Sequence, residues 1–247
     1  MSKYEPLDAL KRKLDSFRPL PSEIVRNLHA DLVLRWTYHS NAIEGNTLTL
    51  KETKVVLEGI TVGGKTMREH VEALNHREAI LYMEDLVAKN EPLSEWQIKS
   101  IHQLILKNID DKNAGVYRKI NVIISGAEHV PPDALRVPSD MGKLIGWHQA
   151  QGAALHPVER AARLHADFVK IHPFVDGNGR TARLLMNLEL MKSGFPPVVL
   201  PVERRLQYYE ALDTAHTKND YEPFLQLITE MAAAGFEPYW RVLGLTK

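Results

Sequence analysis

The sequence predicts a mostly α-helical, single-domain protein that carries one small β-hairpin. Apolar residues recur at helical spacing through most of the 247 residues. Only residues 121–130 combine a run of β-branched side chains with a turn, as a hairpin does. No repeat, low-complexity run or Gly/Ser-rich linker divides the chain. We therefore expect an N-terminal region (1–90), a core (91–235) and a C-terminal tail (236–247) that form one continuous unit.

The N-terminal region should begin with an arm and a long helix. Residues 1–21 are charged, end in a Pro-Leu-Pro sequence and are expected to lie on the surface of the domain. Ser22 can cap a helix that runs to about Ile43, and Gly45 supplies its C-terminal stop. The side chains expected to face the core from this helix are Val25, Leu28, Leu32 and Trp36.

Further helices are expected at about 50–58, at 66–88 and from Ser94 through Leu106. The hairpin at 121–130 follows, and Pro131-Pro132 closes it. The remaining helices are expected at about 139–151, 157–171, 178–193, 202–217 and 220–234. In the 66–88 helix the inward-facing residues should be Met67, Val71, Leu74 and Leu81.

The amino-acid composition argues against several classes of function. Thirty-one basic residues balance 31 acidic ones, so no overall field favours nucleic acid or an anionic membrane. The chain has no cysteine, which excludes disulfides, thiolate metal sites and thiol catalysis and fits a reducing compartment. The N-terminus lacks the apolar stretch of a signal peptide, and no run is long enough for a membrane span. We expect a cytoplasmic protein.

The segment from His172 to Arg183 reads HPFVDGNGRTAR and concentrates chemically active side chains. Pro173 disfavours the helical conformation at His172, so the preceding helix should end there. Glycines on either side of Asn178 bring bare backbone N–H groups to the start of the next helix, which is a ready anion site. Arg180 and Arg183 lie three positions apart and should point to the same side.

Two further side chains complete this segment. Asp176 places a carboxylate beside the positive cluster, where Mg²⁺ could bridge it to phosphate oxygens. His172 can take up a proton near neutral pH. The segment therefore indicates a nucleotide-phosphate site with a general base.

A second informative segment, SNAIEGN, spans Ser40 to Asn46. Ser40 and Glu44 lie four apart and share one face of a helix. Glu44 would sit at the helix C-terminus, where the macrodipole disfavours an anion by about 0.3–1 kcal/mol. We therefore expect a cationic partner for it elsewhere, and the arginines of the phosphate site are candidates.

The HPFVDGNGRTAR segment resembles the motif HPFx[DE]GNGRxxR of the Fic family (filamentation induced by cAMP), and it matches every specified position. Members of this family transfer AMP from ATP to a protein hydroxyl, and their fold is a helical bundle with a small β-hairpin. The resemblance implies that His172 deprotonates the target Ser, Thr or Tyr and that Asp176 binds Mg²⁺. It implies nucleotide contacts for Asp176, Gly177, Asn178, Gly179, Arg180, Thr181 and Arg183.

The SNAIEGN segment is similar to the inhibitory motif [ST]xxxE[GN] of the same family. By this resemblance Glu44 pairs with Arg183 and blocks productive placement of the γ-phosphate. Residues 41–50 and 183–209 are most similar to metazoan members. The resemblance implies an autoinhibited enzyme that modifies an unidentified target protein and itself. Because members of the family often dimerise, it also implies a homodimer.

Contacts outside these motifs are also implied by the resemblance. The hairpin corresponds to the family's flap, whose backbone registers the target side chain as an added strand, with Ser125, Gly126 and His129 as contacts. Tyr208 and Tyr209 match a nucleotide-contacting tyrosine pair, although both also suit a helix core. His216 stands where metazoan members have an adenine-contacting Asn, which leaves the choice of nucleotide base open.

Two alternatives to AMP transfer remain at this level. The same two motifs also occur in members that remove AMP from a modified protein, with Glu44 positioning water. A binding module that only senses nucleotide is a third hypothesis, against which the intact base and metal carboxylate argue. The sequence from Gly59 to Thr66 matches the P-loop pattern GxxxxGK[ST], but no buried strand precedes it, so we expect an interhelix loop.

Overall fold

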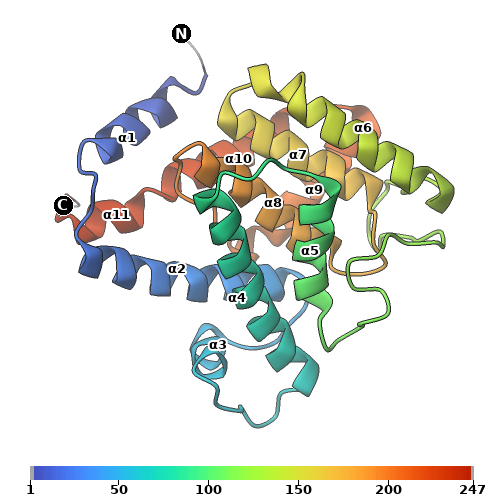
Figure 1. The fold of residues 1–247 in the computed structure, drawn as a ribbon, viewed down its shortest axis with the longest axis horizontal. Helices are drawn as coiled ribbons and strands as arrows, with labels where there is room; N and C mark the ends of the chain where they lie inside the picture. The colour runs from blue at the N-terminus through green and yellow to red at the C-terminus, as the bar shows by residue number, and fades with distance from the viewer. Residues whose placement is uncertain (1–2, 246–247) are drawn as a thin grey trace.

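The protein is a bundle of α-helices without a sheet, as seen in the computed structural model, which describes residues 3–245 (Figure 1). Within that range there are eleven α-helices and three short 3-10 helices. The helices of the N-terminal half are α1 (Glu5–Asp15), α2 (Ser22–Ile43), α3 (Leu50–Leu57), α4 (Met67–Ala88) and α5 (Glu95–Leu106). Those of the C-terminal half are α6 (Val137–Gln149), α7 (Pro157–Ile171), α8 (Asn178–Lys192), α9 (Arg205–Lys218), α10 (Glu222–Ala234) and α11 (Glu237–Val242).

Helix α8 lies at the centre of the bundle. It packs along α7 and is also contacted by α2, α4 and α5 (Figure 1). Every residue from Asn178 to Leu190 except Gly179 is buried, and this set includes the charged side chains of Arg180, Arg183 and Glu189. The start of α8 is therefore held inside the molecule, next to the C-terminal end of α2.

Local sequence explains most helix boundaries. Thr49 with Glu52, and Thr66 with Glu69, form capping boxes that begin α3 and α4. Ser94 caps α5 through its hydroxyl, as expected. The Gly59–Thr66 segment joins α3 to α4, so the interhelix loop expected there is found and the P-loop alternative is wrong.

The predicted β-hairpin at 121–130 is wrong, because no residue of the described 3–245 range is in a strand. The segment is an irregular loop in which Ile123 is 86% exposed and Val130 is 74% exposed. Its amides bond elsewhere: those of Glu128 and His129 donate to the Asp213 carboxylate on α9. A two-stranded ribbon without a sheet or core to cover its apolar side chains is only marginally stable in water.

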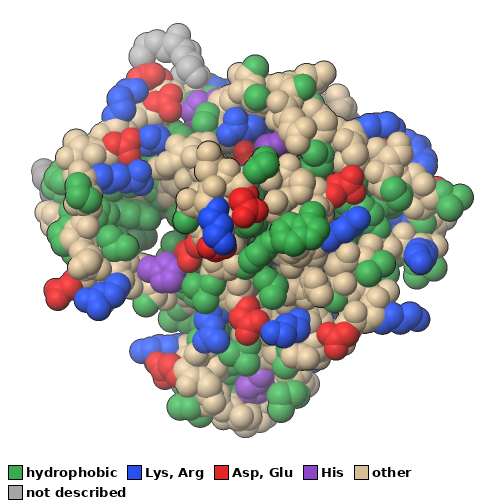
Figure 2. Space-filling model, in the orientation of Figure 1, with side chains coloured by type: hydrophobic (Ala, Val, Ile, Leu, Met, Phe, Trp, Pro, Cys, Tyr) green, Lys and Arg blue, Asp and Glu red, His purple; other side chains and the backbone are tan. Residues whose placement is uncertain are grey.

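The buried faces of α2 and α4 also differ from the expected ones. Val25 is 45% exposed, and with Leu28 and Leu32 it lines an apolar groove of about 260 Å³ beside α10 and α11, at the left in Figure 2. Met67 is 70% exposed and Leu81 is 46% exposed. The face of α4 that packs in the core instead contains many small or polar side chains, which apolar periodicity does not reveal. Its buried residues are His70, Ala73, Asn75, His76, Ala79, Ile80, Met83 and Leu86.

Both ends of the described chain form helices that contact the bundle, whereas a surface arm and a tail were expected. Within residues 1–21, α1 buries Leu7 and Leu14, and α1 contacts α10. The expected tail contains α11, which contacts α2; residues 1–2 and 246–247 lie outside the described range. A search of the described helices for one both long and apolar enough to cross a membrane found none.

Candidate active site

The HPFVDGNGRTAR loop connects the two central helices α7 and α8. Helix α7 ends at Ile171, and His172 takes a left-handed conformation with φ of 50°, so the helix stops where Pro173 predicts. The Asn178 side chain closes the loop: its Oδ1 accepts from the Phe174 amide at 3.0 Å and its Nδ2 donates to the Phe174 carbonyl at 2.9 Å. The side chain of Asn178 is therefore a structural clamp, and only its backbone N–H can serve an anion.

Gly177 is required for two reasons. Its φ is 77°, a conformation that other residues rarely adopt. A Cβ placed there would also lie 3.2 Å from His102 Nε2 and 3.2 Å from Ile105 Cγ2. A larger residue would therefore push the loop away from α5.

His102 on α5 binds the backbone of the loop and packs against Phe174, a role that the sequence did not indicate. Its Nε2 lies 2.8 Å from the Asp176 carbonyl, its Nδ1 accepts from the Gly115 amide at 2.9 Å, and its ring stacks on Phe174 at 3.5 Å. The two hydrogen bonds fix the tautomer with the proton on Nε2. Burial lowers the pKa of His102 to about 4, so the ring is neutral at pH 7.

Arg118 is a second support that sequence reasoning missed. It is only 3% exposed, and its guanidinium donates to the carbonyls of His172 at 2.8 Å and Ile120 at 2.9 Å. Its own amide donates to the Pro173 carbonyl at 2.9 Å. Arg118 therefore fixes the backbone of the candidate base, and within residues 3–245 it pairs with no carboxylate.

His172 is in the protonation state that a base requires. Burial lowers its pKa to about 4, and the positive charge of Arg118 acts in the same direction, while the Val169 carbonyl and Glu44 oppose the shift. No hydrogen bond of normal geometry reaches Nδ1 from the described residues. At neutral pH the imidazole is thus uncharged and can accept a proton.

The N-terminus of α8 has the properties of an anion site. Within residues 3–245 no side chain caps it, and its first amides have no acceptor one turn earlier in the helix. Several buried polar atoms nearby also have no partner among the described residues, namely Arg183 Nη1, Arg180 Nε and Thr181 Oγ1. Unpaired buried donors are costly, and an anionic ligand would satisfy them.

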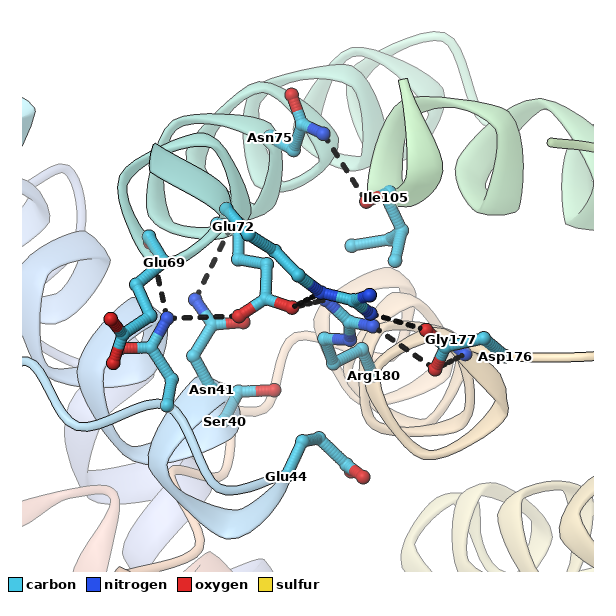
Figure 3. A network of polar contacts seen from close by, with 12 residues as sticks. Ser40, Asn41, Glu44, Glu69, Glu72, Asn75, Ile105, Asp176, Gly177 and Arg180 are labelled. Atoms are coloured by element: carbon cyan, nitrogen blue, oxygen red, sulfur yellow. Dashed lines mark hydrogen bonds and ion pairs between the residues drawn. The ribbon is translucent and has the colours of Figure 1, made fainter. Parts of the chain in front are cut away.

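Glu44 reaches this anion site. It follows the last residue of α2, and a Cβ built on Gly179 would lie only 2.3 Å from Glu44 Oε1. Figure 3 shows its side chain extending from the end of α2 toward the start of α8. A carboxylate oxygen therefore already lies against the turn of α8 that would receive a phosphate.

Arg183 is bound by the α2 end from which Glu44 projects. Its Nη2 donates to Glu44 Oε1 at 2.7 Å and to the Ser40 carbonyl at 2.8 Å, and its Nε donates to Ser40 Oγ at 3.0 Å. Burial alone would lower the pKa of Arg183, but the Glu44 carboxylate outweighs it and the pKa is raised. The cationic partner expected for Glu44 is thus Arg183, 139 positions away.

Arg180 is held on the other side of the site. Its Nη2 lies 3.3 Å from Asp176 Oδ1, and its Nη1 lies 3.6 Å from Glu72 on α4 (Figure 3). Burial tends to raise the pKa of Asp176, but Arg180, the Gly177 amide and Arg68 lower it overall. Asp176 is thus an anion with both oxygens engaged. The described residues contain no group of three or more His, Asp or Glu side chains arranged to bind a metal.

The side chains expected to contact the nucleotide make hydrogen-bonding contacts with other residues of the protein. Tyr208 is buried and its hydroxyl lies 3.1 Å from His165 Nε2, while the Tyr209 hydroxyl donates to the Ile43 carbonyl at 3.1 Å. His216 Nε2 lies 2.8 Å from the Ala166 carbonyl. Tyr209 therefore contacts the end of α2, next to Glu44, while its side chain stays 38% exposed.

The residues expected in the flap divide into two groups. Ser125 and Gly126 are exposed in the irregular loop. His129 is partly buried, with Nε2 2.8 Å from the Lys170 carbonyl and its ring 5.0 Å from that of His216. His129 thus ties one end of the loop to the helix that carries His172.

Comparisons with known proteins agree with this fold and site. The model of the Fic/DOC family matches residues 92–190. The chain is 38% identical to the protein adenylyltransferase Fic of Nematostella vectensis over 240 residues, which cover 95% of this chain and 56% of that protein. A solved structure of Fic-1 from C. elegans is 34% identical with a TM-score of 0.87, over 98% of this chain and 72% of the solved one.

A solved Fic-domain signalling protein from Bacteroides thetaiotaomicron is 28% identical, with a TM-score of 0.89 over 98% of this chain and 99% of that one. The chain belongs to the Fic/DOC family. The chain spans about half the length of the curated relatives it matches. It covers 56% of the Nematostella vectensis protein, 43% of the Caenorhabditis briggsae protein and 45% of the Caenorhabditis elegans protein.

Proposed function

We propose that this protein is an autoinhibited, Mg²⁺-dependent adenylyltransferase that moves AMP from ATP to a Ser, Thr or Tyr hydroxyl of a target protein. The observation that carries the proposal is the placement of neutral His172 beside an anion site with unpaired buried donors. The curated relatives that share most of this chain are named protein adenylyltransferases, which supports transfer over the reverse removal of AMP.

The reaction follows from these residues. His172 accepts the proton of the target hydroxyl, whose oxygen forms a bond to the α-phosphorus as the bond to pyrophosphate breaks. The amides at the start of α8, with Arg180 and Arg183, stabilise the charge that grows on the phosphates. At pH 7 neutral His172 has one unprotonated ring nitrogen that can accept a proton, which suits attack by a hydroxyl.

The donor set also suits Mg²⁺. This ion is commonly bound by one or two carboxylates together with substrate phosphates, rather than by a cage of protein ligands. Asp176 is ionised and lies at the edge of the anion site, so it would hold the ion. The metal would neutralise charge on the leaving pyrophosphate.

Autoinhibition is proposed from the overlap between Glu44 and the phosphate site. A carboxylate against Gly179 occupies the space of an oxyanion and ties up Arg183. An exposed ion pair would contribute less than about 1 kcal/mol, too little to gate a reaction. Arg183, however, is 3% exposed, so this pair is partly shielded and competes directly with phosphate.

Further contacts remain predictions. We propose that Tyr209 and His216 lie beside the nucleoside and that Tyr208 supports them from the core. Ser125, Gly126 and His129 would meet the target protein. Self-modification, a homodimer and a cytoplasmic location are predicted as well. A pure nucleotide sensor would bind ATP without any turnover.

The decisive experiment compares two glutamates in the same local setting. Glu44→Gly should raise labelling of target proteins and of the protein itself by tenfold or more, because about 1.4 kcal/mol of relief gives a factor of ten. Glu58→Gly is the matched control: Glu58 ends α3, as Glu44 ends α2, and each precedes a glycine with positive φ. Glu58 lies 3.9 Å from Lys54, on the surface.

Both variants would be incubated with labelled ATP, Mg²⁺ and cell lysate, followed by mass spectrometry of the labelled proteins. The melting temperature should be followed in parallel, since glycine costs up to about 1 kcal/mol inside a helix and both positions adjoin one. A folded Glu44→Gly protein that binds ATP and labels no more than wild type would refute autoinhibition. If neither protein transferred AMP under any condition, the transferase assignment itself would fail.

A further inference from the structure

Arg68 lies at the carboxylate that is expected to hold Mg²⁺. It is in the first turn of α4, and its Nη2 donates to Asp176 Oδ2 at 2.8 Å from 108 positions away in the sequence. The other oxygen of Asp176 accepts from the Gly177 amide at 2.6 Å and lies 3.3 Å from Arg180. Both carboxylate oxygens are therefore engaged, and a metal ion that binds Asp176 has to compete with these donors, above all with the positive charge of Arg68 at Oδ2.

Four side chains form a closed ring of alternating charge around this point. Arg68 also donates from Nε to Glu72 Oε1 at 3.0 Å, and that same oxygen lies 3.6 Å from Arg180. Arg180 in turn lies beside Asp176, which closes the ring. Glu72 is fixed in place by Asn46, whose Nδ2 donates to Oε2 at 2.9 Å.

The two arginines of the ring differ in how easily they can move. The Arg180 side chain is 3% exposed, on the central helix, whereas that of Arg68 is 59% exposed. Moving Arg180 would disturb a packed interior, while the Arg68 side chain can rotate into solvent. Of the two, Arg68 is the donor that can leave Asp176 at low cost.

We propose that Arg68 is a placeholder for the metal ion at Asp176, which Mg²⁺ has to displace when Mg·ATP binds. This inference rests on the proposed function, because it assumes that Asp176 receives the ion. The guanidinium neutralises the carboxylate before the metal arrives and repels a second cation while it stays. The placeholder raises the Mg²⁺ concentration that the site requires, and it acts independently of the Glu44–Arg183 pair on the other side of the site.

The test measures nucleotide binding rather than catalysis. Binding of a fluorescent, non-hydrolysable ATP analogue would be followed by anisotropy while Mg²⁺ is titrated. Arg68→Gln should lower the Mg²⁺ midpoint about two- to fivefold, the range expected for an exposed ion pair. Arg68→Lys keeps the positive charge and should leave the midpoint near that of wild type.

Arg35→Gln is the matched control. Arg35 also pairs from Nε with a carboxylate four positions away, at 2.8 Å and 47% exposure, but on α2 away from the site. The Mg²⁺ midpoint of the Arg35→Gln variant should equal that of wild type. An unchanged or higher midpoint in Arg68→Gln, with full binding at saturating Mg²⁺, would overturn the placeholder role alone. If wild type bound no analogue at any Mg²⁺ concentration, the proposed function would fail together with it.

Discussion

The loop from His172 to Arg183 and the segment 121–130 meet near the end of α7 but are built in opposite ways. The loop is fixed by side chains from other parts of the chain, with His102 and Arg118 bound to its carbonyls and Asn178 closing it from within. The segment 121–130 leaves Ile123 and Val130 in solvent. Bond formation requires fixed atoms, whereas a surface that meets a variable partner can remain open until the partner arrives.

The largest effect should come from the fixed loop. His172→Ala removes only the base, so the variant should bind nucleotide normally while the rate of AMP transfer falls by about 10²–10⁴. Labelled-ATP transfer and analogue binding, measured on the same preparation, would separate the two effects. Near-normal transfer would mean that another group accepts the proton.

The second effect is a loss of stability in acid, which also originates around the loop. Burial lowers the pKa of His102, His172 and His216 to about 4, below the value of 6.5 for an unperturbed histidine. As pH falls from 6.5 to 4, the unfolded chain takes up protons that the folded protein does not. The free energy of unfolding should therefore decrease through this window, by up to about 1.4 kcal/mol per pH unit for each group.

Urea unfolding at several pH values would measure this decrease. His216→Gln removes one of the titrating rings and should reduce the slope between pH 6.5 and 4. A free energy of unfolding that stays constant over this window would show that the rings are not buried in their neutral form.

The third prediction compares two asparagines, one from each region. Asn178→Ala breaks two buried hydrogen bonds to Phe174 and should lower the free energy of unfolding by about 1–3 kcal/mol. Asn121→Ala also removes two hydrogen bonds, to Asp133 and Ala134, but at an exposed site, and should cost less than about 1 kcal/mol. Equal losses in thermal or urea unfolding would contradict the contrast between the regions.

The smallest effect on stability is expected at Ile123. Ile123→Ser should change the free energy of unfolding by less than about 0.5 kcal/mol, because the side chain is 86% exposed. If the segment meets the target protein, the variant should raise KM for the target without changing affinity for nucleotide. An unchanged KM would place target binding elsewhere.

The difference between the regions also explains which expectations succeeded. The helix stop before Pro173, the cap at Ser94 and the helix start at Asn178 depend on residues within a few positions of each other, and all three were predicted. The hairpin was not, because strand pairing depends on a sheet or core to cover it, and the β-branched run alone does not supply one.

The sequence by itself determined the helical class, most helix limits and the set of groups that gather at the candidate site. Those features follow from periodicity, capping and one dense motif, in which each residue's role is set by its neighbours. Even the partner of Glu44 could be expected, since a carboxylate at a helix C-terminus requires a cation.

Only the tertiary structure decided which distant side chains hold these groups in place. His102, Arg118, Glu72 and Arg68 carry no local signal, because a lone histidine or arginine on a helix or in a loop has many possible environments. Packing α8 into the centre brings α2, α4 and α5 around its first turn and so selects these residues. A buried charge or backbone carbonyl has to find a partner, and the fold determines which one is within reach.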